Sequence, residues 1–174
     1  MKYSKITISG KICTGKTTLF WNLQKKLNWP VFSTSQYFRD LARFKKFSLE
    51  KAQEQNERTT KEVDFRVRDL LKTKGNLIAE GWMTGIMAEK LPRILKILLV
   101  CTDQKRIKRF SQREKISLTE AKKRITKREI SLFDKLERIY NRRDFVNPKN
   151  YNLVVDTSEL TPGQVLQTVV DKLI

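Results

Sequence analysis

The sequence contains no histidine and only two cysteines, Cys13 and Cys101. These scarcities exclude a metal site built from cysteine and histidine ligands, and so few thiols are typical of a protein in a reducing compartment. The sequence also lacks the run of about 18 apolar residues that a membrane-spanning helix needs. Lys2 and Lys5 precede only a short apolar stretch, which is not the pattern of a secretory signal. We therefore expect a cytoplasmic protein with no membrane partner.

Acidic residues are scarce relative to basic ones. The 174 residues include 37 Lys or Arg and 19 Asp or Glu, which gives a net charge of +18. Half of this excess lies in residues 102–149, which hold sixteen Lys or Arg and seven Asp or Glu. Such a surplus attracts polyanions, so non-specific RNA binding is one expectation and a merely solvated basic face is the other. The length suits one domain and is too short for two ordinary ones.

Residues 10–17 read G-x-x-x-x-G-K-T and follow a β-branched run. Between a strand and a helix, this spacing is typical of a loop that binds the phosphates of a nucleoside triphosphate. Gly10 and Gly15 permit backbone conformations that turn successive N–H groups toward a phosphate. Lys16 is expected to reach the β- and γ-phosphates and to act in catalysis, and the Thr17 hydroxyl to bind Mg²⁺. The predicted ATP-binding loop comprises Gly10, Lys11, Ile12, Cys13, Thr14, Gly15, Lys16, Thr17 and Thr18.

Apolar periodicity predicts an alternation of strands and helices along the chain. Strands are expected at 4–9, 31–33, 76–81, 94–101 and 151–155, and helices at about 16–27, 36–44, 63–71, 103–114, 118–140 and from 162 onward. This alternation predicts an α/β fold of three layers, with a parallel five-stranded sheet and helices on both faces. Ser35 is the expected N-cap of the helix at 36–44. Residues 49–60 are so polar that either an exposed helix or a mobile segment is expected there.

Ligands of such sheets bind beyond the carboxyl ends of the strands, which brings Glu80 close to the loop at 10–17. A carboxylate there accepts hydrogen bonds from Mg²⁺-bound water, so Glu80 is a candidate metal residue acting through water. Arg106, Arg109 and Arg113 share one helix face, because they are three and four residues apart. Of these three, Arg106 is expected to be a surface charge or to form a structural ion pair.

Arg128 interrupts the apolar stripe of the long helix at 118–140, a stripe that includes Leu118, Ile125 and Leu132. A cation in line with an apolar stripe must meet a counter-charge or a ligand. Phosphoryl transfer requires several fixed cations around the transferring group. Arg113 and Arg128 are therefore predicted to be catalytic, together with the lysine of the phosphate-binding loop.

Several short motifs keep the order found in a known family. After the loop at 10–17 they are Ser33-x-x-x-x-Phe38-Arg39, Asp64, Asn76-Leu77-Ile78-Ala79-Glu80-Gly81, Arg109-x-x-x-Arg113-Glu114, Arg128-Glu129 and Asp156-Thr157-Ser158. With these motifs the chain resembles the short, archaeal-type cytidylate kinases of the nucleoside monophosphate kinase superfamily. The likeness covers nearly the whole length. The loop alone is unspecific, and the Phe-Arg and Arg-Glu motifs narrow the resemblance to this family.

The resemblance implies a single P-loop kinase domain over residues 1–174, with its core at 1–34, 76–105 and 145–174. A monophosphate-binding insertion at about 35–75 and a lid at about 110–135 are implied with it, and closure of the lid over ATP would exclude water. The implied reaction is phosphoryl transfer from ATP, with Mg²⁺, to CMP or dCMP, and we expect a monomer.

The resemblance also implies roles for individual residues. Ser33, Arg39 and Asp64 would contact the acceptor nucleotide. Arg109 would bind ATP, and Arg109, Arg113 and Arg128 would reach phosphates from the side of the lid.

Two positions depart from the family pattern. Trp82 stands where these kinases usually have arginine, and Lys135, with Phe133 nearby, stands where another arginine tends to occur. Lysine keeps the charge but lacks the bidentate fork. Trp82 is a candidate acceptor-binding residue that stacks on a base, or else it fills the site of a different or lost acceptor. Two alternatives therefore stay open: a kinase for another small acceptor, and an RNA- or ribosome-associated P-loop ATPase.

Overall fold

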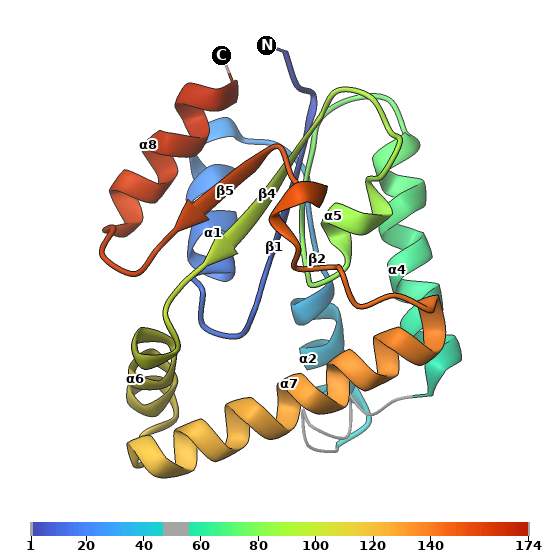
Figure 1. Ribbon diagram of the computed structural model, residues 1–174. Helices are drawn as coiled ribbons and strands as arrows, with labels where there is room; N and C mark the ends of the chain where they lie inside the picture. The colour runs from blue at the N-terminus through green and yellow to red at the C-terminus, as the bar shows by residue number, and fades with distance from the viewer. Residues whose placement is uncertain (1, 47–55, 174) are drawn as a thin grey trace.

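The structure, a computed structural model, describes residues 2–46 and 56–173. Its centre is a parallel five-stranded sheet with the strand order β2-β3-β1-β4-β5 (Figure 1). The strands are β1 (Lys5–Gly10), β2 (Val31–Ser33), β3 (Leu77–Glu80), β4 (Ile94–Val100) and β5 (Leu153–Asp156). The α/β fold and the five parallel strands predicted from the sequence are confirmed.

Helices cover both faces of the sheet, as predicted. They are α1 (Lys16–Leu27), α2 (Thr34–Phe44), α4 (Glu57–Lys72), α5 (Thr84–Met87), α6 (Asp103–Glu114), α7 (Leu118–Tyr140) and α8 (Pro162–Leu173), with a 3₁₀ turn at Pro148–Asn150. Figure 1 shows α7 running across the edge toward which the strands point, from α6 to α4. No helix among the described residues is both long enough and apolar enough to span a membrane.

Two apolar clusters, one on each face, hold the sheet between its helices. Ile6 and Ile8 of β1 pack with residues of α1 and α8 such as Leu23 and Val169. On the other face, Ala79 packs with residues of α4, α5 and α7. The uninterrupted apolar sequence of β4 follows from this arrangement, because a central parallel strand is buried on both faces. All parallel strands end at one edge, so the loops that follow them meet there.

The structure corrects several details of the sequence prediction. Ser33, not Ser35, caps α2, because its hydroxyl accepts a hydrogen bond from the N–H of Gln36 at 3.1 Å. Leu118 does not belong to the buried stripe of α7, since it is 58% exposed. The short helix α5 was not predicted. Of the polar region at 49–60, residues 49–55 lie outside the described residues, and residues 57–60 form the first turn of α4.

Gly85 of α5 packs against the aromatic ring of Tyr151, and a Cβ at this position would lie 2.3 Å from Cε1. The Tyr151 hydroxyl donates a hydrogen bond to the carbonyl of Phe145, which restricts movement of the ring. We expect Gly85→Ala to lower the free energy of unfolding by about 1–3 kcal/mol, because overpacking forces the ring or helix to shift. Urea denaturation measures this change.

Gly163→Ala in α8 is the matched control, because no heavy atom lies within 4 Å of its added Cβ. A glycine-to-alanine change in a helix with free space is expected to be neutral or stabilising by up to about 1 kcal/mol. Equal effects of the two substitutions would contradict the packing described for Gly85.

Candidate phosphate-binding and acceptor site

The loop between β1 and α1 has the backbone conformation that its glycines permit. Gly10 and Gly15 have φ angles of 147° and 93°, and Cys13 has a φ angle of 60°. A Cβ at Gly10 would lie 2.4 Å from the carbonyl oxygen of Leu99 in β4. The loop therefore passes so close to the neighbouring strand that only glycine fits at this position.

Four successive carbonyl groups of this loop accept hydrogen bonds from side chains around it. The pairs are Lys16 Nζ and Thr14 Oγ1 to Lys11 at 2.8 and 3.0 Å, Arg106 to Ile12 at 3.0 Å, Arg109 to Cys13 at 3.4 Å, and Thr157 Oγ1 to Thr14 at 2.9 Å. In a planar trans peptide the N–H points opposite to the carbonyl. The N–H groups of Cys13, Thr14 and Gly15, which follow three of these carbonyls, are thus turned away from the donors, as an anion-binding loop requires. The N–H of Ile12, which follows the fourth, donates instead to the Glu129 carboxylate.

Lys16 is buried at the first position of α1. Its Nζ lies 5.6 Å from the centre of the Trp82 ring, in addition to the bond to the loop carbonyl. Burial lowers the pKa of the Lys16 ammonium, and the charge of Glu80 opposes that effect. The ammonium is therefore desolvated before any ligand binds, which strengthens its attraction for a phosphate oxygen.

Glu80 ends β3 and is 1% exposed. Its carboxylate accepts hydrogen bonds from the hydroxyl groups of Ser33 at 2.5 Å and Ser35 at 3.4 Å. Thr17 and Thr18 are exposed in the first turn of α1. These hard oxygen donors fit Mg²⁺, which is usually held by one or two carboxylates, water and substrate phosphates. The described residues contain no group of three acidic or cysteine side chains that would make a closed metal cage.

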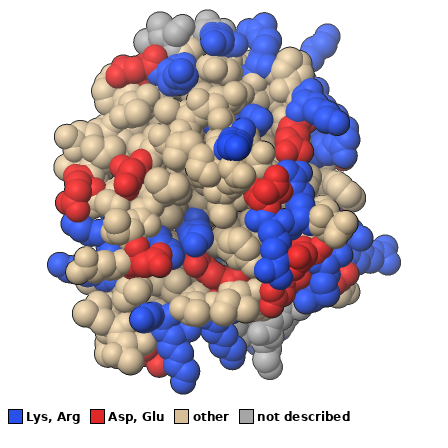
Figure 2. All heavy atoms as spheres, viewed as in Figure 1, with Lys and Arg blue, Asp and Glu red and all other residues tan. Residues whose placement is uncertain are grey.

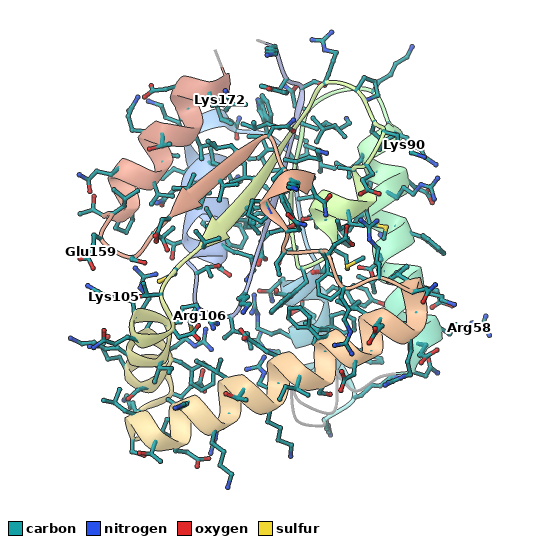
Figure 3. All side chains as sticks on the ribbon, viewed as in Figure 1. Arg58, Lys90, Lys105, Arg106, Glu159 and Lys172 are labelled. Carbon is teal, nitrogen blue, oxygen red and sulfur yellow. The ribbon has the colours of Figure 1, made fainter. Side chains whose placement is uncertain are left out.

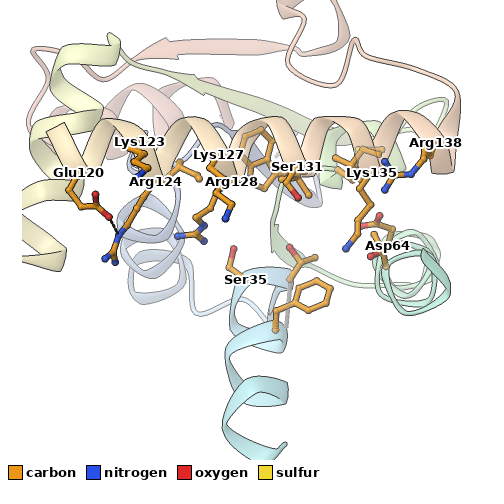
Figure 4. A pocket seen from close by; sticks show the side chains of 18 residues that line it. Ser35, Asp64, Glu120, Lys123, Arg124, Lys127, Arg128, Ser131, Lys135 and Arg138 are labelled. Carbon is orange, nitrogen blue, oxygen red and sulfur yellow. Dashed lines mark hydrogen bonds and ion pairs between the residues drawn. The ribbon is translucent and has the colours of Figure 1, made fainter. Parts of the chain in front are cut away.

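A cavity of about 620 Å³ lies between α7 on one side and α2, α4 and the end of β3 on the other (Figure 4). Within the described parts of the chain, its cationic lining comes entirely from α7, from Lys123, Arg124, Lys127, Arg128, Lys135 and Arg138. The facing wall consists of Thr34, Ser35, Phe38, Thr60, Asp64, Trp82 and Met83, and Ile12 connects the cavity to the phosphate-binding loop. The cavity is therefore suited to a ligand with an anionic part facing α7.

The structure brings some of the predicted site residues to this cavity and leaves others outside its lining. Asp64, Trp82 and Arg128 line it. Arg39 donates a hydrogen bond to Gln36 of its own helix at 3.2 Å. Arg113 forms an ion pair with the neighbouring Glu114 at 2.8 Å and lies over the Phe110 ring. The roles predicted for Arg39 and Arg113 stay predictions.

Arg109 contacts protein groups rather than open space. Its guanidinium donates to the carbonyl of Thr157 at 2.7 Å, to the Thr157 hydroxyl at 3.2 Å and to the carbonyl of Cys13. This arrangement connects the loop after β5 to the phosphate-binding loop. In the structure, Arg109 therefore positions the loop, and its predicted contact with ATP stays a prediction.

Most of the cationic row of α7 was not predicted from the sequence. Only Arg128 and Lys135 were noticed, although Lys123, Arg124, Lys127 and Arg138 line the same cavity. The spacing of three and four residues through 124, 128, 131, 135 and 138 places these positions on one helix face, which was a usable signal. Glu129 and Tyr140 were also missed as contributors, because their partners are far away in the sequence.

Asp64 of α4 faces Lys135 of α7 across one end of the cavity (Figure 4), and it also contacts Tyr140, the last residue of α7. The Tyr140 hydroxyl donates a hydrogen bond to its carboxylate at 2.8 Å. Burial raises the pKa of Asp64 to about 6, against the opposing effects of Tyr140 and Lys135. Asp64 consequently changes its charge in a pH range where most carboxylates are already ionised.

On the face drawn in Figure 2, basic side chains are spread over the surface rather than collected in one stripe. On this face, Lys and Arg occupy several separate areas with Asp and Glu between them. Exposed ion pairs such as Arg58–Glu62 and Arg138–Glu57 account for part of this mixture. Non-specific RNA binding therefore stays an expectation based on net charge.

Comparison with known proteins points to one family. A family model described as the cytidylate kinase-like family matches residues 5–159. The chain is 32% identical over 175 residues to cytidylate kinase of Thermoplasma volcanium, covering 97% of this chain and 90% of that protein. It is 33% identical over 171 residues to cytidylate kinase of Methanobrevibacter smithii, covering 97% of each. Shikimate kinase from Acinetobacter baumannii, solved with shikimate, is similar in fold, with a TM-score of 0.63, 14% identity, and coverage of 98% of this chain and 93% of that one.

The raised pKa of Asp64 predicts a pH-dependent stability. The unfolded chain releases this proton near pH 4 and the folded chain near pH 6, so wild-type stability falls as the pH rises through this interval. Asp64→Asn keeps an oxygen that accepts the hydrogen bond from Tyr140. We expect this variant to have a free energy of unfolding about 3 kcal/mol higher than the wild type above pH 6, and an unchanged one below pH 4. Denaturant unfolding at intervals from pH 4 to 8 measures it.

Asp69→Asn is the control, because Asp69 lies on the same helix with an exposed side chain and a 3.7 Å contact to Lys72. The difference in free energy of unfolding between Asp69→Asn and the wild type is expected to stay nearly constant between pH 5 and 8, because an exposed carboxyl is ionised there in both the folded and the unfolded state. A pH-independent difference for Asp64→Asn over the range from pH 4 to 7 would contradict the raised pKa.

Proposed function

Because the chain belongs to the cytidylate kinase-like family and is a nucleoside monophosphate kinase, we propose that it transfers the γ-phosphoryl group of ATP to CMP or dCMP. Mg²⁺ is the proposed metal ion. Support for the acceptor comes from the two archaeal relatives named cytidylate kinase, which match over 97% of this chain. The proposed products are ADP and CDP or dCDP.

The observation that carries the proposal is the position of the cationic cavity beside the phosphate-binding loop. Ile12 belongs to the loop and also lines the cavity, and Trp82 lines the cavity while its ring lies beside Lys16. A donor with its phosphates on the loop and an acceptor in the cavity would therefore have their phosphates next to each other. Proximity of this kind removes much of the entropic barrier to transfer between two bound substrates.

The proposed roles of the side chains follow from charge and position. Lys16 binds the β- and γ-phosphates from the loop, while Arg128 and its neighbours on α7 stabilise the transferring phosphoryl group and the acceptor phosphate. Thr17, and Glu80 through water, would hold Mg²⁺. The metal ion would supply positive charge that offsets the charge of the phosphate groups during transfer. The region at about 110–135 serves as the lid, and its cover over the cavity excludes water that would otherwise hydrolyse ATP.

Trp82 is uncharged and stands just after β3, at a position where the family resemblance implies arginine. Its ring makes an edge contact with Phe133 of α7, with the ring centres 5.7 Å apart, and Phe133 in turn contacts Phe145 at 4.7 Å. The aromatic contacts fix the ring in the cavity wall. We propose that α7 supplies the positive charge for the acceptor phosphate and that Trp82 contacts the acceptor through its apolar ring.

Turnover with a panel of acceptors tests the proposal. We expect ADP formation from ATP and Mg²⁺ to be stimulated by CMP or dCMP and far less by UMP, AMP or GMP. Lys16→Ala should reduce the stimulated rate by at least about 100-fold, because it removes a charge that acts on the transferring phosphate. A coupled assay of ADP measures each rate.

Lys25→Ala is the control variant, since Lys25 lies in the last turn of the same helix and is exposed. Its rate should equal that of the wild type. Absence of stimulation by every nucleoside monophosphate, in a sample that binds ATP, would refute the proposed reaction, and stimulation by a different acceptor would refute the proposed substrate.

A further inference from the structure

A buried ion pair from two helices binds both backbone polar groups of one residue of the phosphate-binding loop, Ile12. Arg106 of α6 and Glu129 of α7 are 3% and 9% exposed, and their side chains are joined at 2.6 Å. Oε1 of Glu129 accepts a hydrogen bond from the N–H of Ile12 at 3.2 Å, and Nη1 of Arg106 donates to the carbonyl of Ile12 at 3.0 Å. Both polar groups of a single loop residue are thus bound by the pair. Figure 3 shows Arg106 on the inner side of α6, whereas Arg58 and Lys90 lie at the periphery.

The ion pair does more than join α6 to α7, because both of its side chains also bind the loop. A helix-to-helix ion pair requires only the contact between the two side chains. Here the same Nη1 atom contacts both Glu129 and the loop, and the same Oε1 atom contacts both Arg106 and the loop. Asp103 accepts two further hydrogen bonds from Arg106, at 3.2 and 2.5 Å, which fixes the guanidinium on the side of α6.

Ile12 directly precedes a residue of the loop with an unfavourable backbone conformation. Cys13, the next residue, has a φ angle of 60°, a backbone conformation that residues other than glycine rarely adopt. Such a backbone persists only where its surroundings fix it. Ile12 also lines the cavity, whose cationic lining is on the same helix as Glu129. The pair therefore connects the conformation of the loop to the placement of the α7 cations.

We infer that Glu129, acting with Arg106, is a positioning residue for nucleotide binding: the pair holds the backbone on both sides of Ile12 so that the loop keeps its phosphate-binding conformation. The Glu129 carboxylate does not touch the nucleotide. The inference rests on the proposed function only for the identity of the ligand, a nucleotide whose phosphates bind the loop.

The decisive variant removes both charges together. Arg106→Leu combined with Glu129→Leu leaves no unpaired buried charge, and replacing a buried ion pair with apolar side chains often leaves stability unchanged. We expect its thermal unfolding to stay close to that of the wild type, while its dissociation constant for a fluorescent ADP analogue rises at least about tenfold. Binding is measured without acceptor, so the result does not depend on the acceptor proposal.

Glu129→Gln provides a second test that does not depend on how the double variant packs. Glutamine keeps one oxygen acceptor for the Ile12 N–H, so its dissociation constant should lie between those of the wild type and the double variant. Arg143→Leu with Glu137→Leu is the matched control, because it removes an exposed ion pair between α7 and the segment that follows it. This control should bind the analogue as tightly as the wild type.

The outcomes separate positioning from a merely structural role. Wild-type affinity in both the folded double variant and Glu129→Gln would overturn the inference and leave the pair as a helix-to-helix contact. If the double variant does not fold, wild-type affinity in Glu129→Gln together with an unchanged rate of hydrogen exchange at the Ile12 amide overturns it. Failure of every nucleoside monophosphate as acceptor would refute the proposed function, whereas the binding result would still decide the role of Glu129.

Discussion

The central constraint on this structure is that the loop after β1 must keep the N–H groups of Cys13, Thr14 and Gly15 free to bind a phosphate. This backbone conformation fixes the directions of four successive carbonyl groups. Carbonyl groups held in this way need hydrogen-bond donors in place of water. Here Lys16, Arg106, Arg109 and Thr157 supply those hydrogen bonds from α1, α6 and the loop after β5. The packing of the sheet and its helices therefore serves to bring these donors to one loop.

The same constraint accounts for the position of α7 across the end of the sheet. Glu129 attaches its middle to the phosphate-binding loop, and Tyr140 attaches its end to Asp64 of α4. One helix face then carries the cations that line the cavity, between these two attachments. Trp82 at the end of β3 brings no positive charge to the cavity, and within the described residues that charge comes from the opposite wall.

Much of this fold was predictable, because its signals are local or periodic. The glycine spacing around Lys16 and the apolar run of β4 each indicated one element, and alternation of the elements indicated a parallel sheet. The contacts that complete the site were not predictable in this way. Glu129 and Ile12 are 117 residues apart, and Arg109 is 48 residues from Thr157. The choice of Ser33 over Ser35 as helix cap also depends on where β2 ends, which sequence preferences do not determine.

The affinity of a bisubstrate analogue tests most directly whether a donor binds the loop while an acceptor binds the adjoining cavity. Adenosine and cytidine joined through five phosphates would reach both positions in one molecule. Linked ligands that reach both their sites gain roughly 10²–10⁴ in affinity over either part alone. We expect such a gain over ATP and over CMP in calorimetry with Mg²⁺. Binding no tighter than that of ATP alone would show that the cavity is not the acceptor site.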